Sequence, residues 1–204
     1  RGTVHPASLR RYGAASRWGA QWLDEPGEDH GVVRVSRSVG LPPPWPDVLG
    51  LSLRFPGSGG AMHDLLLATT GLARPTRYLL TPRRDPGAAT YSCLLPYRTH
   101  AGSLVLLAAR PVVRGAPRPR LVFELCIATP AGEWSPFGEL TVSTEEELPD
   151  VSFDPIRNPL PGLYLPGALA RLRESAYVGA RAGRGARDRE LVVLPAVVRG
   201  ERVD

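Results

Sequence analysis

One tyrosine and two arginines near the carboxyl end of the chain have types and spacing suited to iron chemistry. Arg173, Tyr177 and Arg184 would share one face of a helix, because residues four and seven apart lie on the same side. A phenol has a pKa of about 10 and is a poor anionic ligand at neutral pH, unless nearby cations or a bound ferric ion stabilise the phenolate. The stripe therefore predicts a tyrosinate that ligates a metal.

The same stripe fits haem. Tyrosine is a known axial ligand of haem iron, and the forked guanidinium group of an arginine such as Arg184 matches a haem propionate. The run over 166–177, which has helix-forming residues after an initial proline, is the helix that would carry the stripe. The alternative is that Tyr177 is an ordinary half-buried helix tyrosine.

Charge and composition exclude several classes of chemistry. The net charge is +5 and every one of the 25 basic residues is an arginine. Without lysine there is no Walker-type phosphate loop and no lysine Schiff base. The arginines are spread along the chain without an aromatic-interleaved basic platform, so we expect no nucleic-acid partner.

Cysteine content and hydropathy indicate the environment of the protein. Cys93 and Cys126 form neither a disulfide framework nor a zinc site, which favours a reducing cytoplasm. No apolar run approaches the roughly 20 residues that span a bilayer. We therefore expect no membrane partner.

The 22 prolines and 22 glycines divide most of the chain into short runs typical of β-strands. These runs alternate or are rich in apolar and β-branched residues; they cover 31–39, 49–55, 63–70, 90–97, 103–110, 120–128 and 137–144. Many short strands separated by Gly/Pro turns predict an antiparallel sandwich or barrel.

The pattern changes after the last of these runs. The proline-rich stretch over 148–166 predicts an irregular strap that wraps the surface. The helix predicted over 166–177 and an apolar strand over 190–198 would follow it. We expect a single domain, with the barrel over 1–148 and the strap, helix and last strand over 149–204.

Short motifs precede the stripe in a defined order. They are Val4-His5 with Tyr12-Gly13, Arg34-Val35-Ser36, Asp47 with Gly50, Arg54 and Phe55, Asp64-Leu65 leading to Thr69, and the strap motif "FDPIRNPLPG" over 153–162. Together with Arg173, Tyr177 and Arg184, they resemble the haem catalases and their small catalase-like peroxidase relatives.

The resemblance implies an α+β, mostly β fold, in which an eight-stranded antiparallel barrel covers one face of haem b and the proximal helix covers the other. Tyr177 would then ligate the iron, with Arg173 holding it as the phenolate. Arg34 and Arg184 would pair with the propionates. The implied apolar walls of the pocket are Val4, Val35 and Phe55.

The resemblance also implies catalytic roles. His5 would act as the distal acid/base, moving a proton from one peroxide oxygen to the other, while Ser36 hydrogen-bonds its second ring nitrogen. Thr69 stands where the family has an asparagine, and its hydroxyl is shorter with a single donor. Gly2 occupies the position of a family arginine. His5 could instead be a surface or core histidine, and Ser36 and Thr69 plain strand residues.

These departures, and a chain much shorter than a full catalase, favour a peroxidase over a disproportionating catalase. The partners would be hydrogen peroxide or an organic hydroperoxide and a small-molecule reductant, acting on a monomer or homodimer. Two alternatives remain: a non-catalytic barrel that binds haem or an apolar small molecule, and an enzyme that rearranges fatty-acid hydroperoxides. We interpret His63-Asp64 as the start of a strand, and the acidic run 145–147 as a solvated surface.

Overall fold

The computed structural model describes residues 2–112 and 120–166. The predicted proximal helix with Arg173, Tyr177 and Arg184 lies outside the described residues, as does the strand predicted over 190–198.

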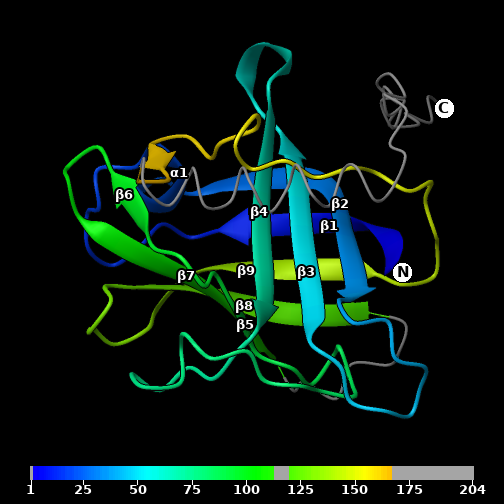
Figure 1. Cartoon of the computed structure of the whole chain (residues 1–204). Helices are drawn as coiled ribbons and strands as arrows, with labels where there is room; N and C mark the ends of the chain where they lie inside the picture. Colours follow the sequence, from blue (N-terminus) through cyan, green and yellow to red (C-terminus); the bar gives the residue numbers. More distant parts are fainter. Residues whose placement is uncertain (1, 113–119, 167–204) are drawn as a thin grey trace, which may run out of the picture. The chain divides into compact units, whose positions relative to one another are not determined.

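Eight antiparallel strands close into a barrel (Figure 1). They are β1 (Gly2–Arg11), β2 (Gly27–Arg37), β3 (Leu49–Pro56), β4 (Met62–Thr69), β5 (Tyr91–Ser92), β7 (Leu104–Pro111), β8 (Arg120–Ala128) and β9 (Ser135–Ser143). Neighbours follow the order β7, β5, β4, β3, β2, β1, β9, β8, and the pairing of β7 with β8 completes the circle. The prediction of an eight-stranded antiparallel barrel is confirmed.

The remaining elements are short. The strands β6 (Tyr97–Thr99) and β10 (Leu163–Tyr164) extend the sheet beside β7. A single helical turn, α1 (Gln21–Asp24), lies between β1 and β2, and the 3-10 turn η1 (Ser58–Gly60) lies between β3 and β4.

Alternation along the strands divides the apolar residues between two cores. In β3, every second residue from Leu49 to Phe55 is buried and packs inside the barrel. A second cluster lies on the outer face of the barrel; it consists of Val4, Val32 and Phe153, with Leu66, Leu148 and Val151 packed against them. The outer cluster shows that the strap covers part of the barrel wall.

Most strand predictions match the structure, with two differences. The run over 90–97 divides into β5 and β6 rather than forming one strand. β1 was not among the predicted strands, because Pro6 lies inside it and proline cannot donate to a ladder.

The backbone of β1 explains why Pro6 is tolerated there. The Val4 carbonyl accepts a hydrogen bond from Leu148 N–H at 2.7 Å. The backbone N–H and C=O groups of every second residue in a strand point to the same side, so an N–H on Pro6 would point to that side as well. The pairing of β1 with β9 begins only at Ala7. The missing N–H therefore falls between the bridge and the ladder, where no ladder bond is lost.

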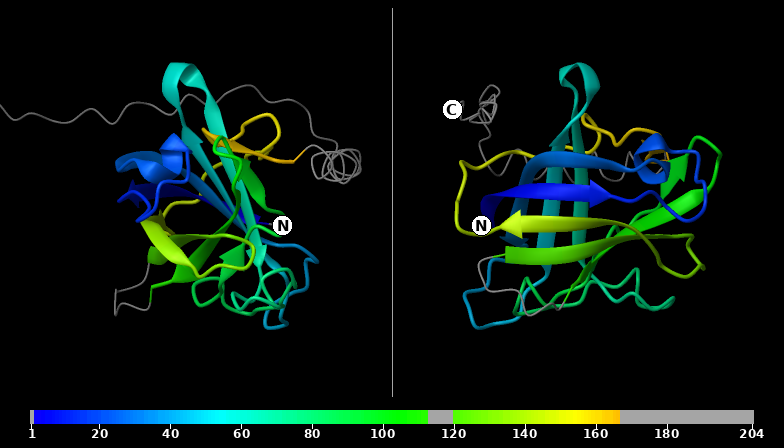
Figure 2. Two further views of the ribbon diagram at one scale, coloured as in Figure 1. Left: turned by 90° about the vertical axis from the view of Figure 1, so that its left-hand side faces the viewer. Right: turned by 180° about the vertical axis from the view of Figure 1, so that it is seen from behind.

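The strap runs from residue 148 across the outside of the barrel, and Figures 1 and 2 show it passing over the wall that contains β2, β3 and β4. It is irregular, as predicted, apart from β10, which pairs with β6. Its contacts with β1, β3 and β4 place it next to the candidate site.

Candidate functional site

Small side chains form a row across the outer face of four neighbouring strands. The register aligns Gly2 with Ser36, Ser36 with Gly50 and Gly50 with Ala68. Residues directly opposite each other in antiparallel strands project from the same face, so these four residues, here called the small-residue row, lie side by side. A Cβ on Gly50 would lie 2.6 Å from Ser36 Oγ, which shows how closely the row is packed.

Arg34 lies in the next row on the same face. It is aligned with Val4 on β1 and with Ser52 on β3. Its Nη1 is 3.5 Å from the exposed carboxylate of Asp150. Its Nε is buried and has no hydrogen-bond partner among the described residues, although buried N–H groups are nearly always paired. This donor lies 3.0 Å from where a Cβ on Gly2 would be, beside the small-residue row.

His5 is buried on the opposite face of β1, the face that turns toward the barrel interior. It is aligned with Val33, a core residue. Its Nδ1 is 2.8 Å from the Glu146 carbonyl oxygen, and its Nε2 is 2.8 Å from Thr3 Oγ1. A carbonyl only accepts, so Nδ1 carries a proton, and in the neutral ring Nε2 accepts from the Thr3 hydroxyl.

The predicted hydrogen bond between Ser36 and His5 is not formed. Ser36 is aligned with Gly2, three residues before His5, and an odd offset in a pleated strand places two side chains on opposite faces. Thr3 supplies the hydroxyl instead, because residues two apart share a face. Thr3 was missed because β1 was not predicted as a strand. The spacing of two residues between Thr3 and His5, which in a strand places both side chains on one face, is the signal that could have identified it.

Thr69 and the predicted apolar wall residues divide between the two faces of the barrel wall. Thr69 is buried, and its Oγ1 accepts a hydrogen bond from Leu49 N–H at 3.0 Å. Phe55 belongs to the barrel core and Val35 packs against it, whereas Val4 lies in the outer cluster. The fold thus brings Val4, Arg34 and Ser36 together outside, and it does not bring Thr69 near His5, which is three strands away.

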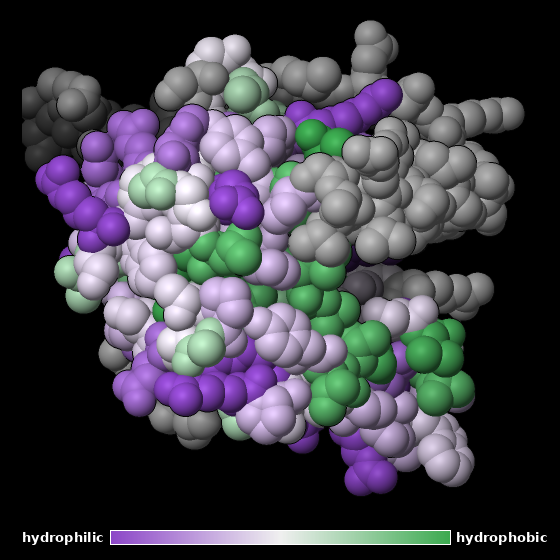
Figure 3. All heavy atoms as spheres, turned by 60° about the vertical axis from the view of Figure 1, so that its left-hand side comes forward, coloured by the Kyte–Doolittle hydropathy of each residue, from purple (hydrophilic) through white to green (hydrophobic). Residues whose placement is uncertain are grey.

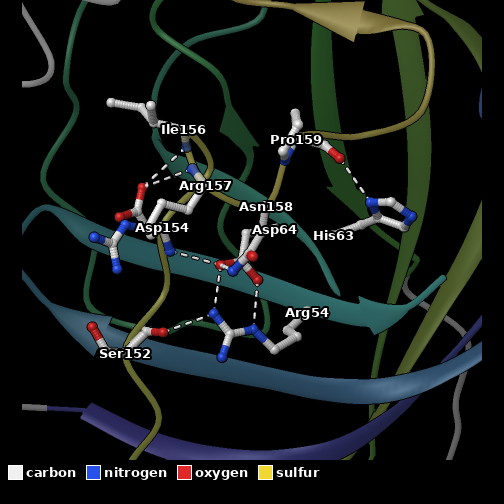
Figure 4. Close-up of polar contacts among 9 residues, drawn as sticks. All are labelled: Arg54, His63, Asp64, Ser152, Asp154, Ile156, Arg157, Asn158 and Pro159. Carbon is white, nitrogen blue, oxygen red and sulfur yellow. Dashed lines mark hydrogen bonds and ion pairs between the residues drawn. The ribbon is translucent and has the colours of Figure 1, made fainter. Parts of the chain in front are cut away.

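A buried carboxylate ties the strap to the barrel (Figure 4). Asp64 accepts hydrogen bonds from Arg54 Nε at 2.7 Å and Arg54 Nη2 at 2.6 Å. It also accepts from Asp154 N–H at 2.6 Å and Asn158 Nδ2 at 2.9 Å. Arg54 Nη2 donates in addition to the Ser152 carbonyl at 2.7 Å. We call these residues the strap clamp.

The strap clamp gives a structural role to residues that the sequence presented as separate motifs. Arg54 comes from the third motif, Asp64 from the fourth, and Asp154 and Asn158 from the strap. His63 Nδ1 also contacts the Pro159 carbonyl at 2.7 Å. His63 and Asp64 lie at the start of β4, which begins at Met62, as predicted. Within residues 2–112 and 120–166, no group of three or more His, Cys, Asp and Glu side chains could hold a metal ion.

A groove opens at the other end of the strands, away from Thr69. Its volume is about 430 Å³, and its lining includes Arg11, Trp22, Asp29, Phe55 and His63. The guanidinium group of Arg11 already donates hydrogen bonds within the chain, to Asp29 at 2.7 Å and to the Trp22 and Glu25 carbonyls. We assign the candidate site to the outer face near Arg34, where a donor is still available.

Comparisons with known proteins bear on the fold. No family model matches the chain, and no curated protein matches it. Among solved structures, a fungal catalase superposes with a TM-score of 0.63 at 11% identity, over 91% of this chain and 59% of that one. The chain has a catalase-like fold. Catalase A from Saccharomyces cerevisiae gives a TM-score of 0.59 at 10% identity, over 88% of this chain and 59% of that one.

These likenesses confirm the resemblance at the level of the fold. The chain spans 59% of the length of each of the two catalases. In the described part of the chain, no helix is long and apolar enough to cross a bilayer.

Proposed function

We propose that this chain binds haem against the small-residue row and acts as a haem-dependent oxidoreductase that cleaves hydrogen peroxide or organic hydroperoxides. The observation that carries the proposal is the buried, unpaired Nε of Arg34 beside that row, on the outer wall of a catalase-like barrel. The partners of the protein would be the peroxide and a separate small-molecule reductant. We further propose that the protein acts in the cytoplasm as a monomer or homodimer.

The residues of the outer face fit such a group. A porphyrin is flat and apolar and carries two carboxylates, so it needs a wall of small side chains and a nearby guanidinium group. Ser36 and its three neighbours in the row are partly exposed, and Arg34 has a donor to offer. Tyr177, Arg173 and Arg184 are proposed for the opposite face of the haem; they lie outside the described residues.

When bound, the haem supplies an iron that activates the O–O bond, and a tyrosinate ligand raises its electron density. The protein's own part is proton transfer. His5 Nε2 is the nitrogen that can take a proton, because Nδ1 is held protonated by the Glu146 carbonyl. Since His5 lies on the face of β1 opposite the small-residue row, it does not touch a peroxide bound at the row, and any proton it gives or takes passes through other groups, beginning with the Thr3 hydroxyl. The Thr3 hydroxyl can turn from donor to acceptor when Nε2 becomes protonated.

The test is an absorption spectrum of the purified chain after haem is supplied, recorded beside Tyr177→Phe and Arg34→Met. We expect a stoichiometric Soret band in the parent, an altered or lost band in Tyr177→Phe and an affinity about tenfold lower in Arg34→Met. Peroxide turnover with a chromogenic reductant should then fall in His5→Ala while haem remains bound. Absence of stoichiometric haem from the parent would refute the proposal.

A second candidate function is haem or apolar-ligand binding without turnover. It is favoured by the fact that both ring nitrogens of His5 are hydrogen-bonded and that His5 does not share a face with Arg34. A haem-loaded parent that shows no peroxide turnover, and a His5→Ala variant that behaves identically, would support this second function over the first.

A further inference from the structure

Two neighbouring loops at one end of the barrel expose large apolar side chains to water. The first loop joins β2 to β3 and the second joins β4 to β5; both lie at the lower end in Figure 1. Their exposed residues, here called the apolar rim, are Val39, Leu41, Trp45, Leu79 and Leu80, with 70% of Val39, 64% of Trp45 and 58% of Leu79 accessible. Large apolar side chains exposed at one end of a protein mark a candidate interaction site.

The two loops are joined by main-chain hydrogen bonds. Asp47 N–H donates to the Arg83 carbonyl at 2.9 Å, and Arg83 N–H donates to the Asp47 carbonyl at 2.8 Å. This two-residue bridge ties the two loops together at Asp47 and Arg83. The two parts of the rim therefore belong to loops that are tied together at one end of the barrel.

The first loop turns its polar backbone inward. The buried carboxylate of Asp47 accepts hydrogen bonds from the N–H groups of Val39, Gly40 and Leu41 at 3.0, 2.8 and 3.0 Å. The other N–H groups of the loop donate within the chain as well: Ser38 to Val48, Trp45 to Pro42 and Asp47 to Arg83. The remaining residues from 38 to 47 are Pro42, Pro43, Pro44 and Pro46, which have no N–H.

Arg37 satisfies backbone carbonyl groups of the first loop, as Asp47 satisfies its N–H groups. Its Nε donates to the Leu41 carbonyl at 2.8 Å, and its Nη2 donates to the Trp45 carbonyl. Arg37 also pairs with Asp47, with Nε and Oδ2 3.7 Å apart. The loop is thus held in shape from within, so displaying Val39, Leu41 and Trp45 needs no further ordering on binding.

A loop with every N–H satisfied internally is suited to a hydrocarbon environment, where an unpaired backbone donor costs several kcal/mol. Tryptophan is also favoured at the boundary between lipid and water. The rim adjoins cationic side chains, since Arg83 and Arg84 are exposed in the second loop and are followed by Asp85, whose carboxylate accepts from Gly87 N–H. Figure 3 shows strongly apolar and strongly hydrophilic side chains adjoining on one face of the barrel.

We propose that the apolar rim docks the protein peripherally on an anionic lipid surface. Trp45, Leu79 and their neighbours enter the interfacial layer, while Arg83 and Arg84 meet the anionic headgroups. Docking of this kind needs no membrane-spanning helix, so the apolar-run argument that led us to expect no membrane partner does not apply to it. It is also independent of haem and of peroxide chemistry.

The test uses the full chain and sedimentation with vesicles. We expect binding to phosphatidylcholine vesicles that contain phosphatidylserine, with little binding to phosphatidylcholine alone and a decrease as salt is added. The double variant Trp45→Ser/Leu79→Ser should bind about tenfold more weakly. Arg83→Gln/Arg84→Gln should lose about fivefold for each arginine. Ile156→Ser, an exposed apolar residue of the strap, is the matched control and should bind like the parent.

Fluorescence separates insertion from simple adhesion. The emission of the parent should shift to shorter wavelength on the anionic vesicles, and the shift should diminish in Trp45→Phe, which retains binding. Equal binding by Trp45→Ser/Leu79→Ser and the parent, with all variants folded, would overturn the proposal. So would self-association of the parent without lipid that the same double variant abolishes, because the rim would then seat a second copy of the chain.

Discussion

Thr3 and Glu146 determine which nitrogen of His5 carries the proton. The Glu146 carbonyl holds the proton on Nδ1, and the Thr3 hydroxyl occupies Nε2. In this geometry Thr3 orients the imidazole, and Ser36, on the other face of the wall, does not. Any proton chemistry at His5 therefore involves the Thr3 hydroxyl first.

Thr3→Val and Ser36→Ala form a matched pair that tests this assignment. Thr3→Val keeps the shape but leaves Nε2 without its partner, so it should lower the free energy of unfolding by about 1 kcal/mol. Ser36→Ala removes a hydroxyl that does not contact His5, and the change should stay within about 0.5 kcal/mol. Urea unfolding gives both values, and nitrogen chemical shifts of His5 report the tautomer. The reverse order of effects would restore Ser36 as the partner of His5.

Asp47 predicts a dependence of stability on pH. Burial acts to raise the pKa of its carboxyl, but hydrogen bonds from Val39, Gly40 and Leu41 N–H and the charge of Arg37 outweigh burial, so the pKa is lowered. A lowered native pKa stabilises the fold above the unfolded pKa of about 3.9, and this stabilisation is lost as pH falls through the native value.

Asp47→Asn tests that dependence. The amide cannot carry the charge, so the variant should be less stable than the parent at pH 7. The difference in urea midpoint should begin to shrink as pH falls below about 4, where the unfolded parent takes up the proton, and it should go on shrinking until the native carboxyl is also neutral at its lower pKa. A difference that stays constant between pH 7 and pH 3 would show that the loss comes from altered hydrogen bonding alone.

At the scale of elements, the strap and β4 depend on each other through the strap clamp. Asp64 is completely buried and its negative charge is balanced by Arg54. Removing one partner of a buried ion pair leaves an uncompensated charge or an empty polar site, which typically costs 3–5 kcal/mol. The clamp thus joins three motifs that are up to 104 residues apart, from Arg54 to Asn158.

Asp64→Ala should therefore destabilise the chain by about 3 kcal/mol. It should also raise hydrogen exchange of strap amides such as Asp154 N–H, which donates directly to the carboxylate. Asp150→Ala is the control, because Asp150 is an exposed partner of Arg34 and its pair contributes little. Unfolding in urea and amide exchange measure both effects. Unchanged exchange in the strap of Asp64→Ala would show that the strap is held by its apolar contacts instead.

Strand alternation allowed six of the eight barrel strands to be predicted closely, because a half-buried strand shows its period directly in its residues. β1 was missed, since the effect of Pro6 depends on where the ladder to β9 begins, which is a property of the assembled sheet. Which side chains meet at the candidate site likewise depends on strand register, a property of the assembled sheet. Ser36 and His5 lie on adjacent strands, and only the pairing of Ser36 with Gly2 decides which faces they occupy.

At the scale of the whole molecule, the closed barrel makes the outer face available as a rigid wall. The strap covers the rows that contain Val4 and Val32, while the small-residue row stays partly exposed beside Arg34. A flat ligand needs such a wall without projecting side chains. A single large side chain placed in the row should then block the ligand while the barrel itself remains folded.

Gly50→Leu is that change, and Ser8→Leu, on the outer face of β1 outside the row, is its control. Haem supplied at about 100 times its dissociation constant should stabilise the parent by about 2.7 kcal/mol, or about 5–10 °C in Tm. The rise should persist in Ser8→Leu and vanish in Gly50→Leu, whose new side chain crowds Ser36 and projects where the ring would lie. Each variant must first show a cooperative transition without haem. An equal rise in both would place the haem, if it binds, on another surface of the molecule.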